Sequence, residues 1–257
     1  MQASKLPAIS GLYWTSKGWI FFTQHPINML SWSLSLSLII LLLLSIPILG
    51  LLLNIILMPA FMLISFSLGK RMSEGKSIPS NIWLHSFTRT SDTIKNILLL
   101  GTIYGFVCII VLILSFVPFL NEFTNTAEQI YSNTYDFSSI LIKLYKPIGI
   151  LIILSIVINA FFWYAPVLIA WHNLNFLQAL FFSAIACWRN RFTFLIYGLI
   201  WITIFFFIDS VTKFMIKIGL PIQVANSIEI PLSLIANAVL WSSFYPSYSS
   251  VFSKNSD

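Results

Sequence analysis

Three asparagines are the polar residues placed deepest in the apolar stretches of this 257-residue chain: Asn54, Asn159 and Asn237. One hypothesis makes them a ring of amides that lines a central polar site within a membrane. The other gives each amide a hydrogen bond between neighbouring helices, which is worth about 0.6–2 kcal/mol in membranes. We favour the second hypothesis, because hydrogen bonding between helices is an ordinary use of Asn in membrane proteins.

A second group of polar residues stands where an apolar stretch meets a basic one: His172, Arg189, Asn190 and Arg191. These side chains are candidates for contact with a lipid headgroup phosphate or with an acidic group of a partner protein. The alternative is that the two arginines only anchor the following span by reaching toward the headgroups.

No set of residues in the sequence has the spacing of a catalytic or metal site. The three histidines stand in three different loops, without Asp, Glu or Cys at ligand spacing beside them. Ser183 has no nearby base and acid to activate it as a nucleophile. Cys108 and Cys187 are expected to be small buried apolar side chains. We therefore expect no enzyme activity, no metal and no cofactor.

The composition indicates the class of protein to which these residues belong. Hydrophobic residues make up 58% of the chain and charged residues 9%, against about 25% charged residues in soluble domains. This excludes a soluble enzyme, a disordered chain and a nucleic-acid-binding domain, and predicts an all-α polytopic membrane bundle. The apolar runs are nearly free of charge, which argues against proton-coupled transport because that requires ionisable groups inside the bilayer.

The apolar runs divide into six spans of about the 20 residues that a bilayer requires. The charge-free run from Ile27 to Leu68 is too long for one span, and Pro47 with Gly50 supplies its turn. The spans are expected at Leu30–Ile46, Ile48–Leu68, Ile97–Leu120, Ile148–Ala170, Phe192–Ile208 and Ile228–Tyr245. The fifth is short, and the sixth is the weakest because it holds Glu229 and Pro231. An interfacial segment is the alternative for the sixth.

The basic residues predict the orientation of these spans. With the N-terminus in the cytoplasm, only four of the fourteen Lys and Arg residues fall outside: Lys143, Lys146, Lys213 and Lys217. Because cytoplasmic loops carry the excess of Lys and Arg, both termini are expected in the cytoplasm. Seven of the nine tryptophans, Trp14, Trp19, Trp32 and Trp188 among them, lie near predicted cytoplasmic ends, where an indole suits the headgroup level.

We expect one membrane domain over residues 1–257, organised as three hairpins that each follow an amphipathic helix on the cytoplasmic face. The units cover about residues 9–69, 77–171 and 173–250, and their surface helices are expected at Ile9–Gln24, Pro79–Thr93 and Leu174–Trp188. The third has the clearest apolar face, formed by Phe176, Leu177, Leu180, Phe181, Ala184, Ile185 and Trp188.

Several positions suggest that the three units are internal repeats. The second span of each unit carries one of the three asparagines and a proline toward its cytoplasmic end: Pro59, Pro166 and Pro246. In addition, Ser86 and Gly101 match Ser183 and Gly198 at a constant offset. Coincidence among apolar helices is the alternative explanation.

A resemblance rests on scattered aromatic and proline motifs. These are Tyr164-Ala-Pro166-Val, Ala179-Leu180-Phe-Phe182-Ser183, Arg189-Asn190, Tyr197-Gly198, Tyr245-Pro246-Ser-Tyr248 and Val251-Phe252. Over most of its length the chain resembles an uncharacterised family of bacterial polytopic inner-membrane proteins known only by a locus-tag name. The resemblance implies a protein of the bacterial cytoplasmic membrane and supplies no catalytic residues. The arrangement of hairpins and surface helices is also similar to the membrane regions of some glycerophosphodiester phosphodiesterases, an analogy of fold alone.

Together these observations predict a non-enzymatic inner-membrane protein that acts as a scaffold, assembly or regulatory component of the bacterial envelope. Its expected partners are membrane lipids and another membrane protein, not nucleic acid. The alternative function is a facilitator or channel for a lipid-like or weakly polar solute, which the three asparagines and the span prolines would suit. A third function, an enzyme at the headgroup layer, lacks a catalytic set.

Overall fold

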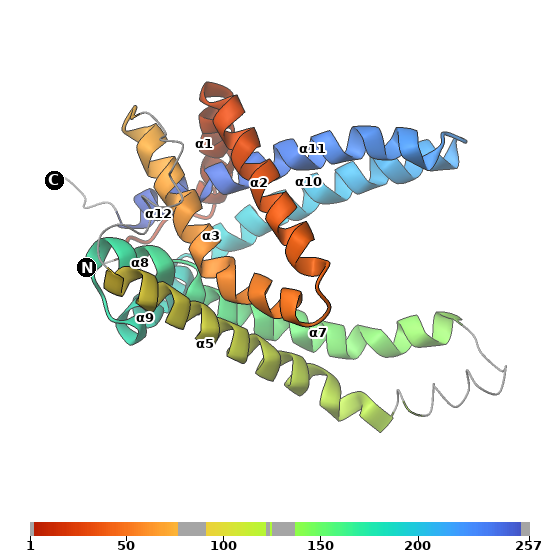
Figure 1. The fold of residues 1–257 in the computed structure, drawn as a ribbon, viewed down its shortest axis with the longest axis horizontal. Coiled ribbons are helices and arrows are strands. Elements are labelled where there is room, and N and C mark those ends of the chain that lie inside the picture. Colours follow the sequence, from red (N-terminus) through yellow and green to blue (C-terminus); the bar gives the residue numbers. More distant parts are fainter. Residues whose placement is uncertain (1–2, 77–90, 122–123, 125–136, 253–257) are drawn as a thin grey trace.

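The computed structural model describes residues 3–76, 91–121, 124 and 137–252, and its regular structure there is helical throughout. Figure 1 shows the elements in order. They are α1 (Ser10–Gln24), α2 (Pro26–Leu44), α3 (Leu49–Ser73), α5 (Ser91–Phe116), the 3₁₀ turn η1 (Val117–Phe119), α7 (Phe137–Phe162), α8 (Ala165–His172), α9 (Phe176–Arg189), α10 (Arg191–Lys217), α11 (Ile222–Ser242) and α12 (Phe244–Phe252).

Six of the described helical segments are long and apolar enough to cross a membrane. They are α2, α3, α5, α7 continued by α8, α10, and α11 continued by α12. Each expected span overlaps one of them, and the first three spans pass the helix bounds by one or two residues. This confirms the all-α polytopic fold. Such runs form helices because a helix satisfies its own backbone hydrogen bonds, which hydrocarbon cannot do.

The fifth and sixth spans are longer than expected. Helix α10 continues past Ile208 to Lys217. Asp209 and Lys213 stand four residues apart in this extension and form an ion pair of 2.7 Å, which supports the helix. Helix α11 begins at Ile222 and runs through Glu229 and Pro231 without a break. The expected boundaries of these two spans were therefore too narrow.

The turn between α2 and α3 differs from the expected one in the residue that bends. Ile48 adopts the positive φ of 60°, a conformation that a β-branched residue rarely takes. Gly50 lies inside α3, where an added Cβ would overlap the carbonyl oxygen of Leu43. The glycine therefore allows α2 and α3 to approach closely, and it does not itself form the turn.

The centre of the molecule is built from the segments that follow the three prolines. Pro59 lies inside α3, which bends part-way along its length (Figure 1), and the residues from Pro59 to Phe66 are all buried. Helices α8 and α12 begin just before Pro166 and Pro246, where the missing amide hydrogen costs nothing because the first turn has no acceptor for it. Both short helices are largely buried.

One aromatic ring from each of these segments meets at the centre. The ring centroids of Phe66, Tyr164 and Tyr248 lie 6.1–6.2 Å apart in all three pairs. We call these three residues the central triad. Aromatic pairs at such distances contribute about 0.5–1.5 kcal/mol each beyond the area that they bury, so the triad ties the three parts of the chain together.

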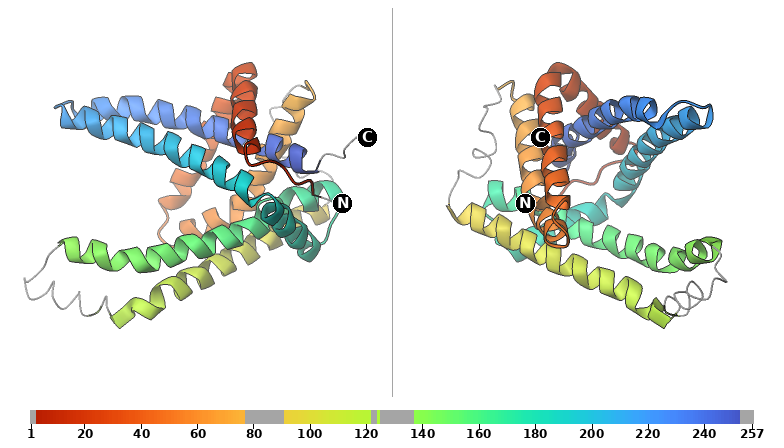
Figure 2. Two further views of the ribbon diagram at one scale, coloured as in Figure 1. Left: turned by 180° about the vertical axis from the view of Figure 1, so that it is seen from behind. Right: turned by 45° about the vertical axis from the view of Figure 1, so that its right-hand side comes forward.

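Successive long helices lie side by side: α2 with α3, α5 with α7, and α10 with α11. The most extensive contact joins α3 to α5, and α2 also packs on α11, so the three expected units share interfaces with one another. Figures 1 and 2 show the α5–α7 pair and the α10–α11 pair extending from the centre, with the two pairs diverging from each other as they extend. The grouping into repeat units stays a prediction.

Helices α1 and α9 form where the first and third surface helices were expected, while residues 77–90, within the range expected for the second, lie outside the described residues. That α1 and α9 lie on the membrane surface stays a prediction. The two ends of the described chain meet beside α9. The backbone N–H of Ser4 donates to the carbonyl of Val251 at 2.8 Å. Both ends therefore lie on one side of the molecule.

Candidate functional site

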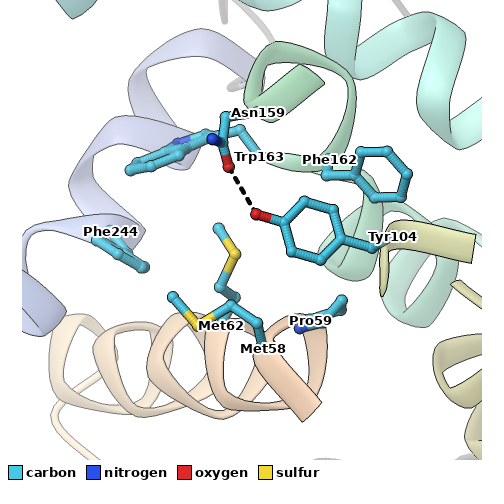
Figure 3. Close-up of a pocket in the computed structure, with 8 residues that line it drawn as sticks. All are labelled: Met58, Pro59, Met62, Tyr104, Asn159, Phe162, Trp163 and Phe244. Atoms are coloured by element: carbon cyan, nitrogen blue, oxygen red, sulfur yellow. Dashed lines mark hydrogen bonds between the residues drawn. The ribbon is translucent and has the colours of Figure 1, made fainter. Parts of the chain in front are cut away.

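Of the three asparagines, Asn159 stands beside a cavity. It lies near the end of α7, and the Tyr104 hydroxyl of α5 donates to its Oδ1 at 3.2 Å. Its Nδ2 donates to the carbonyl of Ser155, four residues earlier, at 2.8 Å. Figure 3 shows Tyr104 and Asn159 facing each other over a small hollow of about 60 Å³ that Met58 and Met62 of α3 close.

A larger cavity of about 290 Å³ adjoins this hollow between α3, α5 and α7. Tyr104 and Asn159 line both spaces, so they stand where the two join and form the polar end of the larger one. The rest of its wall is almost entirely apolar, with Leu52 and Ile55 from α3, Leu112 from α5 and others. We call the larger cavity the α3–α5–α7 groove.

Asn54 and Asn237 do not line either space. Both are half-buried, and the Nδ2 of Asn237 donates to the carbonyl of Ser233 at 2.8 Å, again four residues earlier. Asn159 and Asn237 thus repeat one local bond within two different helices. The ring of three amides stays a hypothesis, and the groove contains one of its members.

The four candidate headgroup residues separate into two kinds. Asn190 is only 1% exposed, and its amide links α9 to the N-terminal segment. Its Oδ1 accepts from the N–H of Leu6 at 2.8 Å, and its Nδ2 donates to the carbonyls of Ser4 and Ala186, both at 2.9 Å. The amide is therefore occupied within the protein and has little left to offer a lipid or a partner.

Arg189, Arg191 and His172 lie exposed near the same end. The Arg191 guanidinium stacks between two aromatic rings, 5.2 Å from that of Trp188 and 4.8 Å from that of Phe192. The Nε2 of His172 lies 2.6 Å from the hydroxyl of Tyr248, a member of the central triad. Of the four candidates, the two arginines are the ones whose charges point outward.

Helix α9 has two distinct faces. A capping box between Asn175 and Gln178 starts the helix. Its small residues, Ala179, Ser183, Ala186 and Cys187, are buried, where it packs on α7 and α8. Leu177, Phe181, Ile185 and Trp188 point outward, with Phe181 59% and Trp188 71% exposed. Two other members of the expected apolar face, Phe176 and Leu180, are partly buried against the core. The outward part of the face is therefore narrower than the sequence predicted.

Ser183 joins α9 to the break between α7 and α8. Its Oγ accepts from the N–H of Tyr164 at 3.0 Å and donates to the carbonyl of Ala160 at 2.9 Å. These are backbone groups that the break deprives of helical partners. Ser183 thus has a structural role that no local motif in the sequence indicated.

The expected headgroup tryptophans are only partly at the surface. Trp14 and Trp32 are buried, and their indole N–H groups donate to Ser250 at 2.8 Å and to Ser65 at 3.1 Å. Trp19 and Trp188 are exposed, as a headgroup role requires. The prediction did not separate the two kinds, because a tryptophan near a span end suits either environment.

Tyr104 is the residue of the groove that the sequence did not single out. A tyrosine inside a charge-free span must find a partner for its hydroxyl, which was the available signal. Among the described residues, no three His, Cys, Asp or Glu side chains gather closely enough to hold a metal ion.

Comparison with known proteins gives one informative similarity. No family model matches the chain, and no solved structure matches it. A protein of Burkholderia thailandensis with a locus-tag name, described as a probable inner membrane protein, is 25% identical over 265 residues. The match covers 98% of this chain and 94% of that protein. The expected resemblance to such inner-membrane proteins is confirmed, and the six apolar helices make this chain an integral membrane helical bundle.

Proposed function

We propose that the chain is a non-enzymatic protein of the bacterial inner membrane that holds a second membrane protein on the exposed face of α9. The location is supported by the six apolar helices and by the description of the Burkholderia protein. The role as a scaffold or assembly component is carried by one observation. Helix α9 presents Leu177, Phe181 and Trp188 outward, beside the charges of Arg189 and Arg191.

The two faces of α9 suit such a role. Small residues fix the inner face closely against α7 and α8, so the outer face is held in one orientation. Large apolar side chains next to exposed arginines match a partner helix that carries an apolar stripe and an acidic group. On the predicted orientation this face lies at the cytoplasmic surface of the membrane.

The local bonds of two asparagines favour this role over a facilitator. The amides of Asn159 and Asn237 donate to carbonyls of their own helices, which is a structural use of an amide. A facilitator for a weakly polar solute would be expected to direct several amides into one shared passage.

Photocrosslinking from single positions in living cells tests the scaffold role. A photoreactive residue replaces Phe181 on α9 or, as the control, Leu199 on α10, which is similarly exposed. We expect one predominant protein adduct from position 181 and lipid adducts alone from position 199. Lipid adducts alone from both positions would reject the scaffold role and leave the facilitator as the better hypothesis.

A further inference from the structure

We propose that the α3–α5–α7 groove binds one acyl chain of an inner-leaflet phospholipid, with the ester carbonyl of that chain accepting a hydrogen bond from Asn159. The inference goes beyond the scaffold role and does not depend on it. Four observations carry it: the position of the groove, its direction, its size and the state of the Asn159 amide.

The groove lies along three helices that cross the membrane, and it opens toward the bilayer. Leu51 of α3 and Leu112 of α5 stand on its wall, and each is about half exposed, at 52% and 51%. Within the hydrocarbon layer there is no water to fill such a space. What surrounds the groove at this depth is lipid chains.

The direction of the groove follows from its lining residues. Its polar end is at Tyr104 and Asn159, and its apolar end is at Leu51, Leu112 and Leu151. These three leucines lie toward the connections that join α2 to α3 and α5 to α7, which the orientation prediction places outside. The polar end therefore faces the cytoplasmic leaflet.

The depth of Asn159 agrees with this direction. Asn159 follows Lys146 by thirteen residues on α7, or about 20 Å of helix. Lys146 was expected at the outer surface, so Asn159 lies in the inner half of a hydrocarbon layer about 30 Å thick. The next residue, Ala160, accepts a hydrogen bond from Ser183 of α9 at 2.9 Å, so Asn159 also lies beside the helix that was expected on the cytoplasmic face.

The size of the groove fits a chain and not a helix. A helix is about 10–12 Å wide and rises about 1.5 Å per residue, which requires roughly 120–170 Å³ per residue. A cavity of about 290 Å³ holds fewer than three such residues. A methylene group takes up about the volume of a water molecule, ~30 Å³, so the same space holds a chain of about ten carbons.

The Asn159 amide supplies the polar contact. One of its N–H groups donates to Ser155 and its oxygen accepts from Tyr104, while the second N–H has no partner among the described residues. The side chain is exposed. An unsatisfied amide N–H in an apolar medium costs about 1–3 kcal/mol. A carbonyl oxygen on the bound chain would remove that cost.

The test uses the full chain in vesicles of phosphatidylethanolamine and phosphatidylglycerol that contain a phospholipid with a diazirine midway along one acyl chain. After illumination, the labelled peptides are identified by mass spectrometry. We expect peptides with residues 109–112 and 151–158 to carry at least about five times the label of the lipid-facing peptides of α10. Equal labelling of all lipid-facing helices would overturn the proposal.

Two matched pairs of variants separate binding from general lipid contact. Leu112→Trp fills the groove and should lower its labelling at least about fivefold, whereas Leu199→Trp, at a similarly exposed position on α10, should not. Asn159→Leu should lower the labelling about three- to tenfold through loss of one hydrogen bond. Asn237→Leu removes an equivalent local bond away from the groove and should leave the labelling unchanged.

The variants also provide the outcomes that reject the proposal. Undiminished labelling in Leu112→Trp would mean that the chain lies elsewhere. If Asn159→Leu fails to fold, Leu112→Trp still decides, because its side chain is half exposed and tolerates a larger ring.

Discussion

At the scale of single residues, the polar side chains near the helix ends hold segments that are distant in the sequence. Asn190 binds the N-terminal segment through Ser4 and Leu6. Ser183 binds the two backbone groups at the break between α7 and α8. In both cases a short side chain satisfies backbone groups that have no helical partner. Removing either side chain leaves buried polar groups unpaired.

Replacing Asn190 should therefore destabilise the protein. Asn190→Leu removes three hydrogen bonds and leaves the N–H of Leu6 and the carbonyl of Ser4 without their partner. We expect a loss of about 2–3 kcal/mol in the free energy of unfolding, measured by thermal unfolding in detergent. Asn226→Leu, at an exposed amide of α11, is the control and should have little effect. Equal stability of the two variants would contradict the role of Asn190.

The sequence identified these polar residues as notable and did not predict their roles. Asn190 was interpreted as a headgroup contact because it stands between two arginines. Two of its three partners are 184 and 186 residues away in the chain. Ser183 and its partners are 19 and 23 residues apart. Local spacing carries no information about contacts of this range, which only the packing of helices creates.

At the scale of helices, the positions of the spans could be predicted from the sequence, whereas the buried face of each helix could not. Charge-free runs of about 20 residues predict spans wherever they occur. The sequence indicates only weakly which side of such a helix contacts protein and which contacts lipid, because both environments are apolar. The burial of Trp14 and Trp32 illustrates this.

Gly101 and Gly198 stand at matching positions of the proposed repeat, so their surroundings show whether the repeat also holds for helix packing. An added Cβ at Gly101 would overlap the backbone carbonyl of Ile56 on α3, while one at Gly198 meets nothing within 4 Å. Gly101→Ala should cost about 1–3 kcal/mol of stability. Gly198→Ala should be neutral or stabilise by up to about 1 kcal/mol, because Ala favours helix. Unfolding in detergent measures both. Similar losses in the two variants would indicate that Gly198 is also packed.

The reactivity of Cys187 reports whether α9 stays docked. Burial raises the pKa of its thiol, and only the thiolate reacts with a maleimide. In a Cys108→Ser background, labelling at pH 7.5 should be at least about tenfold slower in mild detergent than after unfolding in dodecyl sulfate. Rapid labelling of the native protein would mean that α9 leaves its site on α7 and α8.

At the scale of the whole molecule, the fold places both ends of the described chain together and gives the central triad one ring from each third of the sequence. The contact of Ser4 with Val251 requires these two ends to lie on the same side of the membrane, as an even number of spans also requires. The distribution of Lys and Arg chooses which side that is. The geometry alone is compatible with either orientation. The prediction that both ends lie in the cytoplasm therefore requires its own measurement.

Single cysteines at the two ends of the spans provide that measurement. In a background of Cys108→Ala and Cys187→Ala, Lys217→Cys places a thiol at the end of α10, and Lys76→Cys places one just after α3; both positions are exposed. A membrane-impermeant maleimide should label position 217 from outside the inner membrane, and position 76 only after that membrane is opened. The opposite pattern would reverse the orientation, and with it the leaflet proposed for the groove and the side on which α9 meets a partner.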